Sequence, residues 1–179
     1  MNISVLDSAF SYITHLGDGI TSIIICVLLI VFYNLGSGIV ASLGLSICGT
    51  ISYVMKYHWF AYSQRPYHFF WNNKFVHYVD GIIINKENSF PSGHSLTAFF
   101  IFTFIAMLSI AKPTFIQLLL ALVAILAAYS RVYLAQHFVG DIFTGAIMGI
   151  IFGLIFHKIY AKTKTIRFLN TSLIGFIKK

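Results

Sequence analysis

The strongest constraint on this chain is an uncharged run from Gly19 to Met55. A helix needs about 20 mostly apolar residues to cross a bilayer, so this run is long enough for two crossings. The segment from Asn34 to Gly38, which combines glycines with small polar residues, is the expected turn between them. Hydrophobic residues make up 58% of the 179 residues and charged residues only 9%, too few to cover a water-soluble protein. The sequence therefore predicts an integral membrane protein.

Three later segments without charged residues predict three further spans. They cover residues 88–111, 113–130 and 142–157, and Pro113 suits a helix start because it has no amide hydrogen to donate. Residues 3–16 carry apolar side chains at helical spacing, which predicts a short amphipathic helix on the membrane surface. The expected fold class is therefore all-α: a polytopic membrane bundle of about five transmembrane helices plus the N-terminal amphipathic helix, in one domain.

The charges are distributed unevenly between the two membrane faces. With five spans the termini lie on opposite sides, and the C-terminal side receives seven Lys or Arg residues and no acidic residue. Positive residues are retained on the cytoplasmic side, so the basic tail, residues 158–179, is predicted to be cytoplasmic. This explanation of the excess positive charge disfavours nucleic acid as a partner.

Polar clusters interrupt the apolar pattern at three places, all on the more neutral face. Ionisable groups at membrane depth are costly, so their convergence from several helix ends indicates a functional site. The clusters are Arg65-Pro66 with Lys56 upstream, Pro91-Ser92-Gly93-His94, and Ser130-Arg131 followed by His137 and Asp141.

The second cluster is typical of a helix start that binds phosphate. Pro91 and Ser92 are expected to begin the third span, which leaves the amides of Ser92, Gly93 and His94 without helical acceptors. Gly93 lets an anion approach the backbone, the Ser92 hydroxyl adds a donor, and the helix dipole favours negative charge. Taken alone, this cluster is equally well explained as a simple helix cap.

The third cluster predicts a nucleophile. His137 and Asp141 are four residues apart, so on one helix they share a face and the carboxylate can orient the imidazole. The free ring nitrogen can then attack phosphorus and form a covalent phosphohistidine. Arg131 precedes His137 by six residues, about 240° around a continuous helix, so the chain must bend between them.

Together the clusters supply each part that phosphoryl transfer needs. Arg65 and Arg131 can hold phosphate oxygens through paired donors, and His94 can protonate the leaving group. A channel or transporter is the non-enzymatic alternative, but it predicts polar residues spread through the depth of the spans, which are almost free of them.

These motifs, in this order, resemble the signature of the type 2 phosphatidic acid phosphatase superfamily, over residues 56–141. Ser130, Arg131, His137 and Asp141 meet one element in full, and the Pro-Ser-Gly-His element is intact. In the remaining element the family lysine position is occupied by His58. Three explanations stay open: Lys56 reaches the site on a different backbone path, protonated His58 substitutes for the lysine, or the role is missing.

The resemblance implies a phosphohistidine enzyme of the membrane branch that uses no cofactor and no metal. Its catalytic residues would be His137, His94 and Asp141, and Arg65, Arg131, Ser92, Gly93 and Lys56 would bind phosphate. The leading expectation is a bacterial cell-membrane phosphatase whose site faces the periplasm or exterior and whose substrate is a polyprenyl diphosphate such as undecaprenyl diphosphate. Phosphatidylglycerol phosphate, phosphatidate and lipid A phosphate are alternative substrates, and a lipid phosphotransferase using the same histidine is an alternative activity.

Overall fold

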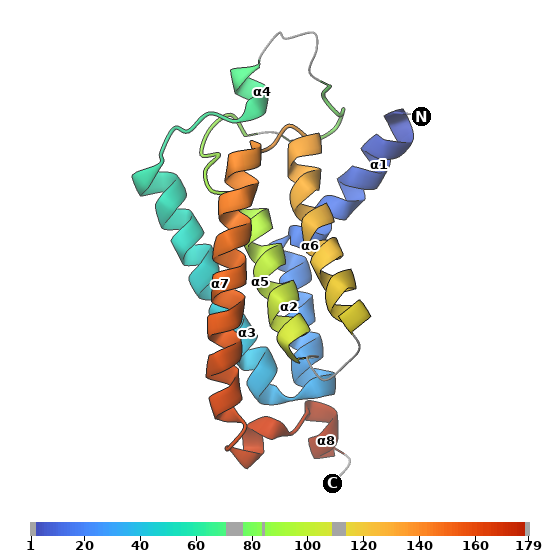
Figure 1. Cartoon of the computed structure of the whole chain (residues 1–179), viewed down its shortest axis with the longest axis vertical. Coiled ribbons are helices and arrows are strands. Elements are labelled where there is room, and N and C mark those ends of the chain that lie inside the picture. Colours follow the sequence, from blue (N-terminus) through green and yellow to red (C-terminus); the bar gives the residue numbers. More distant parts are fainter. Residues whose placement is uncertain (1–2, 71–76, 84, 109–113, 178–179) are drawn as a thin grey trace.

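The computed structural model describes residues 3–70, 77–83, 85–108 and 114–177 and forms an elongated bundle of helices (Figure 1). The expected all-α fold class is confirmed. The bundle helices are α2 (Gly19–Leu28, continued by the π-turn η2, Leu29–Tyr33), α3 (Leu35–Val54, continued by the π-turn η3, Met55–Trp59), α5 (Gly93–Leu108), α6 (Thr114–Tyr133) and α7 (Val139–Thr163). Shorter elements are α1 (Ile3–Ile13), the 3-10 turn η1 (Thr14–Gly17), α4 (Pro66–Phe69), the 3-10 turn η4 (Arg167–Asn170) and α8 (Leu173–Ile177).

All five expected spans contain a bundle helix, but the helices differ in length. Within the described residues, three are long and apolar enough to cross a membrane: Leu35–Trp59, Thr114–Tyr133 and Val139–Thr163. A fourth crossing needs α1 and α2 together, bent by 55° at the break between Gly17 and Gly19, and α5 is a shorter apolar helix. Pro113, the expected start of the fourth span, lies outside the described residues.

The N-terminal helix differs from the expected free surface helix because it packs against the bundle. The ring of Phe10 lies 4.4 Å from that of Tyr133 on α6. Asp7 accepts a hydrogen bond of 2.7 Å from the Tyr133 hydroxyl. The helical spacing was therefore predicted correctly, but the apolar face of α1 contacts protein where the sequence indicated only membrane.

The turn between the first two spans is tighter than the predicted Asn34–Gly38 segment. Asn34 alone is extended, and its side chain caps α3 by accepting a 2.8 Å hydrogen bond from the amide of Ser37. Gly38 lies inside α3, where an added Cβ would stand 2.7 Å from the carbonyl oxygen of Cys26 on α2. Gly38 therefore lets α3 pack closely on α2. Composition alone does not distinguish a glycine with this role from a glycine in a turn.

Close packing of α7 on α5 brings the two most important helix starts together. A Cβ added at Gly145 or Gly149 would lie 2.5 Å from the carbonyl oxygen of Ser92 or Leu96, respectively. Gly153, four residues further on, would also clash with α5. Small residues at a spacing of four let two membrane helices approach backbone to backbone. The start of α5 is thereby held against the start of α7.

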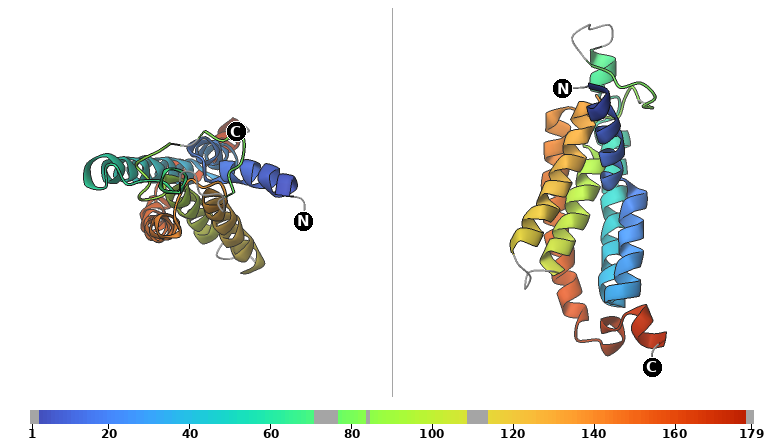
Figure 2. Two further views of the ribbon diagram at one scale, coloured as in Figure 1. Left: turned by 90° about the horizontal axis from the view of Figure 1, so that it is seen from above. Right: turned by 90° about the vertical axis from the view of Figure 1, so that its right-hand side faces the viewer.

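The two ends of the bundle have different contents. The helices α1 and α4 and the α6–α7 turn lie toward one end, and η4 and α8 lie at the other (Figures 1 and 2). The first and last described helices, α1 and α8, thus lie toward opposite ends of the bundle. Cys26 and Cys48 are both buried and free.

Candidate active site

His137 occupies the turn between α6 and α7 and is 2% exposed. Its Nδ1 lies 3.3 Å from the Asp141 carboxylate, and its Nε2 lies 3.4 Å from Nη1 of Arg65. A guanidinium can only donate, so Nε2 is the acceptor and the ring proton is on Nδ1. Nε2, which carries the lone pair, therefore faces the guanidinium of Arg65, a group that commonly binds phosphate.

The surroundings keep His137 neutral. Its pKa is lowered to about 3, chiefly because burial disfavours the charged ring. The hydrogen bond with Asp141 opposes this shift, whereas the positive charges of Arg65, Lys56 and Arg131 add to it. All three predicted cations are thus close enough to act on one imidazole.

Asp141 holds the ring through contacts that extend beyond the predicted pair. Its Oδ2 accepts a hydrogen bond of 3.0 Å from the amide of Phe138, which caps α7. The same oxygen accepts one of 2.5 Å from the hydroxyl of Ser89, whose Oγ is also 3.3 Å from Nδ1 of His137. Ser89 is 1% exposed and completes a buried triangle with the two predicted residues.

Carbonyl oxygens orient the Arg65 guanidinium. Nε donates to Glu87 at 2.9 Å, and Nη2 donates to Asn88 at 3.3 Å. Nη1 donates to both the backbone oxygen and the side-chain oxygen of Gln136, at 3.2 and 3.3 Å. Sequence reasoning missed Gln136, which is 2% exposed and directly precedes His137. The sequence feature that could have indicated Gln136 is its amide side chain, and many surface residues carry the same kind of group.

Lys56, and not His58, reaches the site. Its Nζ donates to the carbonyl oxygen of Asn88 at 3.0 Å, while His58 is exposed. Lys56 belongs to the π-turn η3, whose wider turn changes which side chains face the bundle. This geometry provides the different backbone path that the altered family spacing requires.

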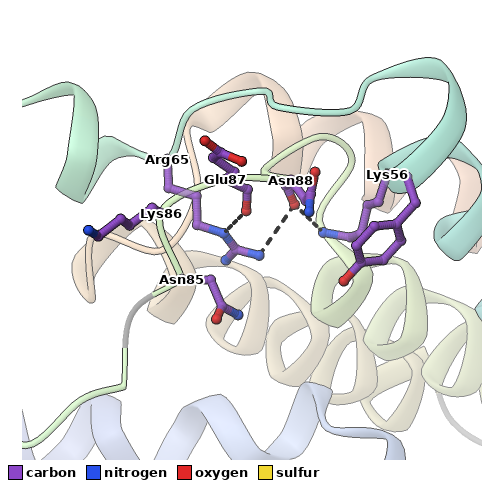
Figure 3. A pocket seen from close by; sticks show the side chains of 7 residues that line it. Lys56, Arg65, Asn85, Lys86, Glu87 and Asn88 are labelled. Atoms are coloured by element: carbon purple, nitrogen blue, oxygen red, sulfur yellow. Dashed lines mark hydrogen bonds between the residues drawn. The ribbon is translucent and has the colours of Figure 1, made fainter.

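The backbone carbonyl oxygen of Asn88 accepts hydrogen bonds from both Lys56 and Arg65. Its backbone has a φ of 58°, in the left-handed region that asparagine tolerates better than most residues. In Figure 3, Lys56 and Arg65 approach its carbonyl oxygen from opposite sides. Together with Tyr57, Asn85, Lys86 and Glu87, these residues line a polar cavity of about 410 Å³.

The α5 start corrects one expectation. The helix begins at Gly93, and the amide of Ser92 donates to the carbonyl oxygen of Asp141 at 3.1 Å, so this amide is not available to phosphate. The Ser92 hydroxyl, fully buried, accepts from the Ser95 hydroxyl at 3.1 Å. Gly93 faces Lys56: an added Cβ would lie 4.0 Å from its Cε. Because α7 packs closely on the start of α5, the Ser92 amide, one of the three expected phosphate donors, is bonded to Asp141 instead.

The expected bend between Arg131 and His137 is confirmed. α6 ends at Tyr133, Ala135 has a φ of 52°, and the amides of Gln136 and His137 both donate to the Arg131 carbonyl oxygen. The Arg131 side chain is 9% exposed, and its Nη1 donates to the hydroxyl of Thr14 at 2.7 Å. Its Nε is buried and has no hydrogen-bond partner among the described residues. A donor of this kind is available to an incoming anion.

A second cavity, of about 390 Å³, is lined in part by His137. Its walls are mainly apolar and include Phe70, Phe138 and Val139. Across the described part of the chain, no group of three or more His, Cys, Asp or Glu side chains could hold a metal ion.

Comparison with known proteins accounts for this arrangement. Residues 36–164 match the sequence model of the PAP2 superfamily. The chain belongs to the PAP2 superfamily. The family expected from the three motifs is therefore confirmed, and the PAP2 match contains each predicted site residue.

Two solved membrane structures resemble this PAP2 protein over most of its length. The crystal structure of Aquifex aeolicus LpxE has 28% sequence identity and a TM-score of 0.70, covering 86% of each chain. The transmembrane PAP2 type phosphatidylglycerolphosphate phosphatase from Bacillus subtilis has 26% identity and a TM-score of 0.70, covering 90% of this chain and 80% of that one.

A curated relative is phosphatidylglycerophosphatase B of Bacillus subtilis (strain 168), 32% identical over 76 residues. The match covers 38% of this chain and 37% of the relative, so it spans little more than a third of that protein.

Proposed function

We propose that this protein is a membrane lipid phosphatase that forms a phosphohistidine at His137. The observation that carries the proposal is the position of the buried His137 ring, whose Nδ1 lies 3.3 Å from the Asp141 carboxylate and whose Nε2 lies 3.4 Å from Nη1 of Arg65. A neutral, oriented imidazole next to an anion-binding cation is the arrangement that nucleophilic attack on phosphorus needs.

The chemistry proceeds in two steps. The substrate phosphate accepts the donors of Arg65, Arg131 and Lys56, which draws Arg65 away from Nε2. Nε2 then forms a bond to phosphorus as the bond to the lipid oxygen breaks, and His94, which is protonated in the complex beside the negatively charged phosphate, gives that oxygen its proton. Water next attacks phosphorus, its proton passes to His94, and the phosphorus–nitrogen bond breaks to release inorganic phosphate.

Two cavities, one lined by Arg65 and the other by His137, support an amphiphilic substrate. The polar cavity, with Lys56 and Arg65, suits a charged headgroup, and the apolar cavity, with Phe70 and Phe138, suits hydrocarbon. A polyprenyl diphosphate at the outer face of the cell membrane remains our first candidate. Phosphatidylglycerol phosphate is the second candidate, favoured by the activity for which the Bacillus subtilis relatives are named.

The proposal is tested by trapping the intermediate. Purified protein in detergent is offered ³²P-labelled polyprenyl diphosphate, phosphatidylglycerol phosphate, phosphatidate and lipid A phosphate in separate reactions, quenched in base because phosphohistidine is acid-labile. The expected result is a labelled wild-type protein and release of free phosphate from at least one lipid. His137→Asn should lose the label and about 10³-fold or more in turnover.

A matched control is His58→Asn, because His58 is exposed and its ring lies 6.4 Å from that of Tyr53 on α3. We expect the label and turnover of this variant to equal those of the wild type. Labelling that survives in His137→Asn would contradict the proposed nucleophile. Transfer of label to an added lipid alcohol, with no free phosphate, would instead identify a phosphotransferase.

A further inference from the structure

The N-terminal turn η1 contacts the active site although it lies outside the family match, which begins at residue 36. Thr14, in this turn, is 7% exposed, and its hydroxyl accepts the 2.7 Å hydrogen bond from Nη1 of Arg131. The bond joins residues 117 positions apart in the sequence. Because Arg131 Nε has no partner in the described part of the chain, Thr14 fixes one branch of the guanidinium while another donor stays free.

The same turn also lies directly against the proposed general acid. A Cβ added at Gly17 would lie 2.9 Å from the carbonyl oxygen of His94 and 3.2 Å from its Cβ. Only a residue without a side chain lets the turn approach α5 this closely without displacing it. The two contacts are separate, one to α6 through Thr14 and one to α5 through Gly17.

Several bonds hold the turn in this position. The Asp18 carboxylate caps α2 by accepting from the amide of Ile20, and the Thr21 hydroxyl donates to the carbonyl oxygen of His15 at 2.6 Å. Upstream, Asp7 accepts from Tyr133 of α6 at 2.7 Å. The turn is therefore anchored on both sides, so that its contacts with Arg131 and His94 are built into the fold.

We propose that η1 is part of the phosphate site, with Thr14 as a positioning residue that orients Arg131 toward the substrate phosphate. Thr14 itself does not touch the substrate. It holds Nη1, so the Nε edge of Arg131 is presented to the anion in the paired geometry that guanidinium groups use for phosphate. Gly17 allows the turn to sit close enough to make this contact. The inference rests on the proposed phosphatase function.

The test uses purified full-length protein in detergent and orthovanadate as the phosphate-like probe, with affinity measured by titration calorimetry. Thr14→Val removes the hydroxyl at nearly constant volume, and its affinity for orthovanadate should fall about 10- to 100-fold, the range for a hydrogen bond to a charged group. Thr14→Ser keeps the hydroxyl and should remain within about threefold of the wild type. Thr50→Val, which removes an exposed hydroxyl that donates to the carbonyl oxygen of Ser46 within α3, is the control and should bind like the wild type.

A double-mutant cycle separates positioning from a purely structural role. In an Arg131→Ala background, Thr14→Val should change the affinity less than about twofold, because the group on which Thr14 acts is gone. An equal effect of Thr14→Val in both backgrounds would overturn the inference. A wild-type affinity for orthovanadate in Thr14→Val would overturn it as well.

The glycine contact gives an independent check. Gly17→Ala should weaken orthovanadate binding at least about tenfold, because the added Cβ cannot coexist with the His94 backbone. Gly19→Ala is the matched control, since a Cβ there would meet nothing within 4 Å. Equal orthovanadate affinities of the two variants would contradict the close packing of η1 against α5. A wild type that neither binds orthovanadate nor releases phosphate would overturn the proposed function itself, whereas a binding wild type with unaffected variants would overturn only this inference.

Discussion

At the residue scale, the chemistry depends on the protonation state of His137. Its Nδ1 proton is engaged by Asp141 and Ser89, and the pKa of the ring is lowered to about 3 by burial and by nearby cations. The ring therefore binds no proton through the window between about pH 6.5, its ordinary pKa, and about pH 3. An unfolded chain does bind a proton there, so His137 reduces stability as the pH falls through this window.

We predict that His137 stays neutral in the free protein from about pH 8 down to about pH 5, well below the ordinary histidine pKa. Nitrogen NMR of protein labelled with ¹⁵N-histidine measures this directly, because the ring shifts differ between the neutral and charged forms. His137→Asn identifies the resonance by its loss. A titration midpoint near pH 6.5 would mean that the site does not hold the nucleophile in its reactive form.

The residues that motif reasoning found and those that it missed differ in a physical way. His137, Asp141 and the predicted cations carry ionisable groups, which are rare in a membrane protein and therefore conspicuous. Ser89 and Gln136 act through neutral hydrogen bonds, and Asn88 acts through its backbone carbonyl. Neutral groups of these kinds occur throughout the sequence, so only the fold distinguishes them.

At the element scale, the α6–α7 turn sets the position of the nucleophile. Ala135 has a φ of 52°, a conformation in which its Cβ crowds the following carbonyl oxygen. The strained residue reverses the chain so that both Gln136 and His137 donate to Arg131. The sequence predicted the bend from the six-residue spacing, but not that an alanine would adopt the strained conformation.

We predict opposite effects of one substitution at two buried positions. Ala135→Gly should leave stability unchanged or raise it by about 1 kcal/mol, since relief of the left-handed conformation exceeds the loss of one buried methyl group. Ala128→Gly, inside α6, should lower stability by about 1–2 kcal/mol, because glycine also disfavours the helix. A thiol-reactive dye that reports exposure of the buried cysteines Cys26 and Cys48 measures the unfolding temperature of each variant. Equal destabilisation would show that the positive φ stores no strain.

The helices themselves were predictable because apolar length and end signals are local. Their contacts were less predictable: Gly36 to Gly38 suggested a turn but lie within α3, and the Gly145-Gly149-Gly153 spacing was not recognised as a helix-packing stripe. A search for small residues every four positions would have found the second of these. Close packing depends on two helices, so the sequence of one helix does not show which other helix it contacts.

At the scale of the whole molecule, the site residues come from five separate elements yet meet at one end of the bundle. η1, η3, the loop around Arg65, the start of α5 and the α6–α7 turn each supply a part. The helices α2, α3, α5, α6 and α7 alternate in direction, so the connections after α3 and α6 lie at the same end (Figure 1), and η1 lies at the 55° bend between α1 and α2. The opposite end carries the basic residues of α7 and η4, including Lys162 and Arg167.

This separation predicts the orientation in the membrane. Positive residues are retained in the cytoplasm, so we expect the C-terminal end inside and the active site outside. Asp80→Cys and Lys162→Cys place exposed thiols near opposite ends, in a background whose native cysteines are buried. A membrane-impermeant maleimide should label Asp80→Cys in intact cells and Lys162→Cys only after the membrane is permeabilised. The reverse pattern would place the site in the cytoplasm and exclude a substrate confined to the outer leaflet.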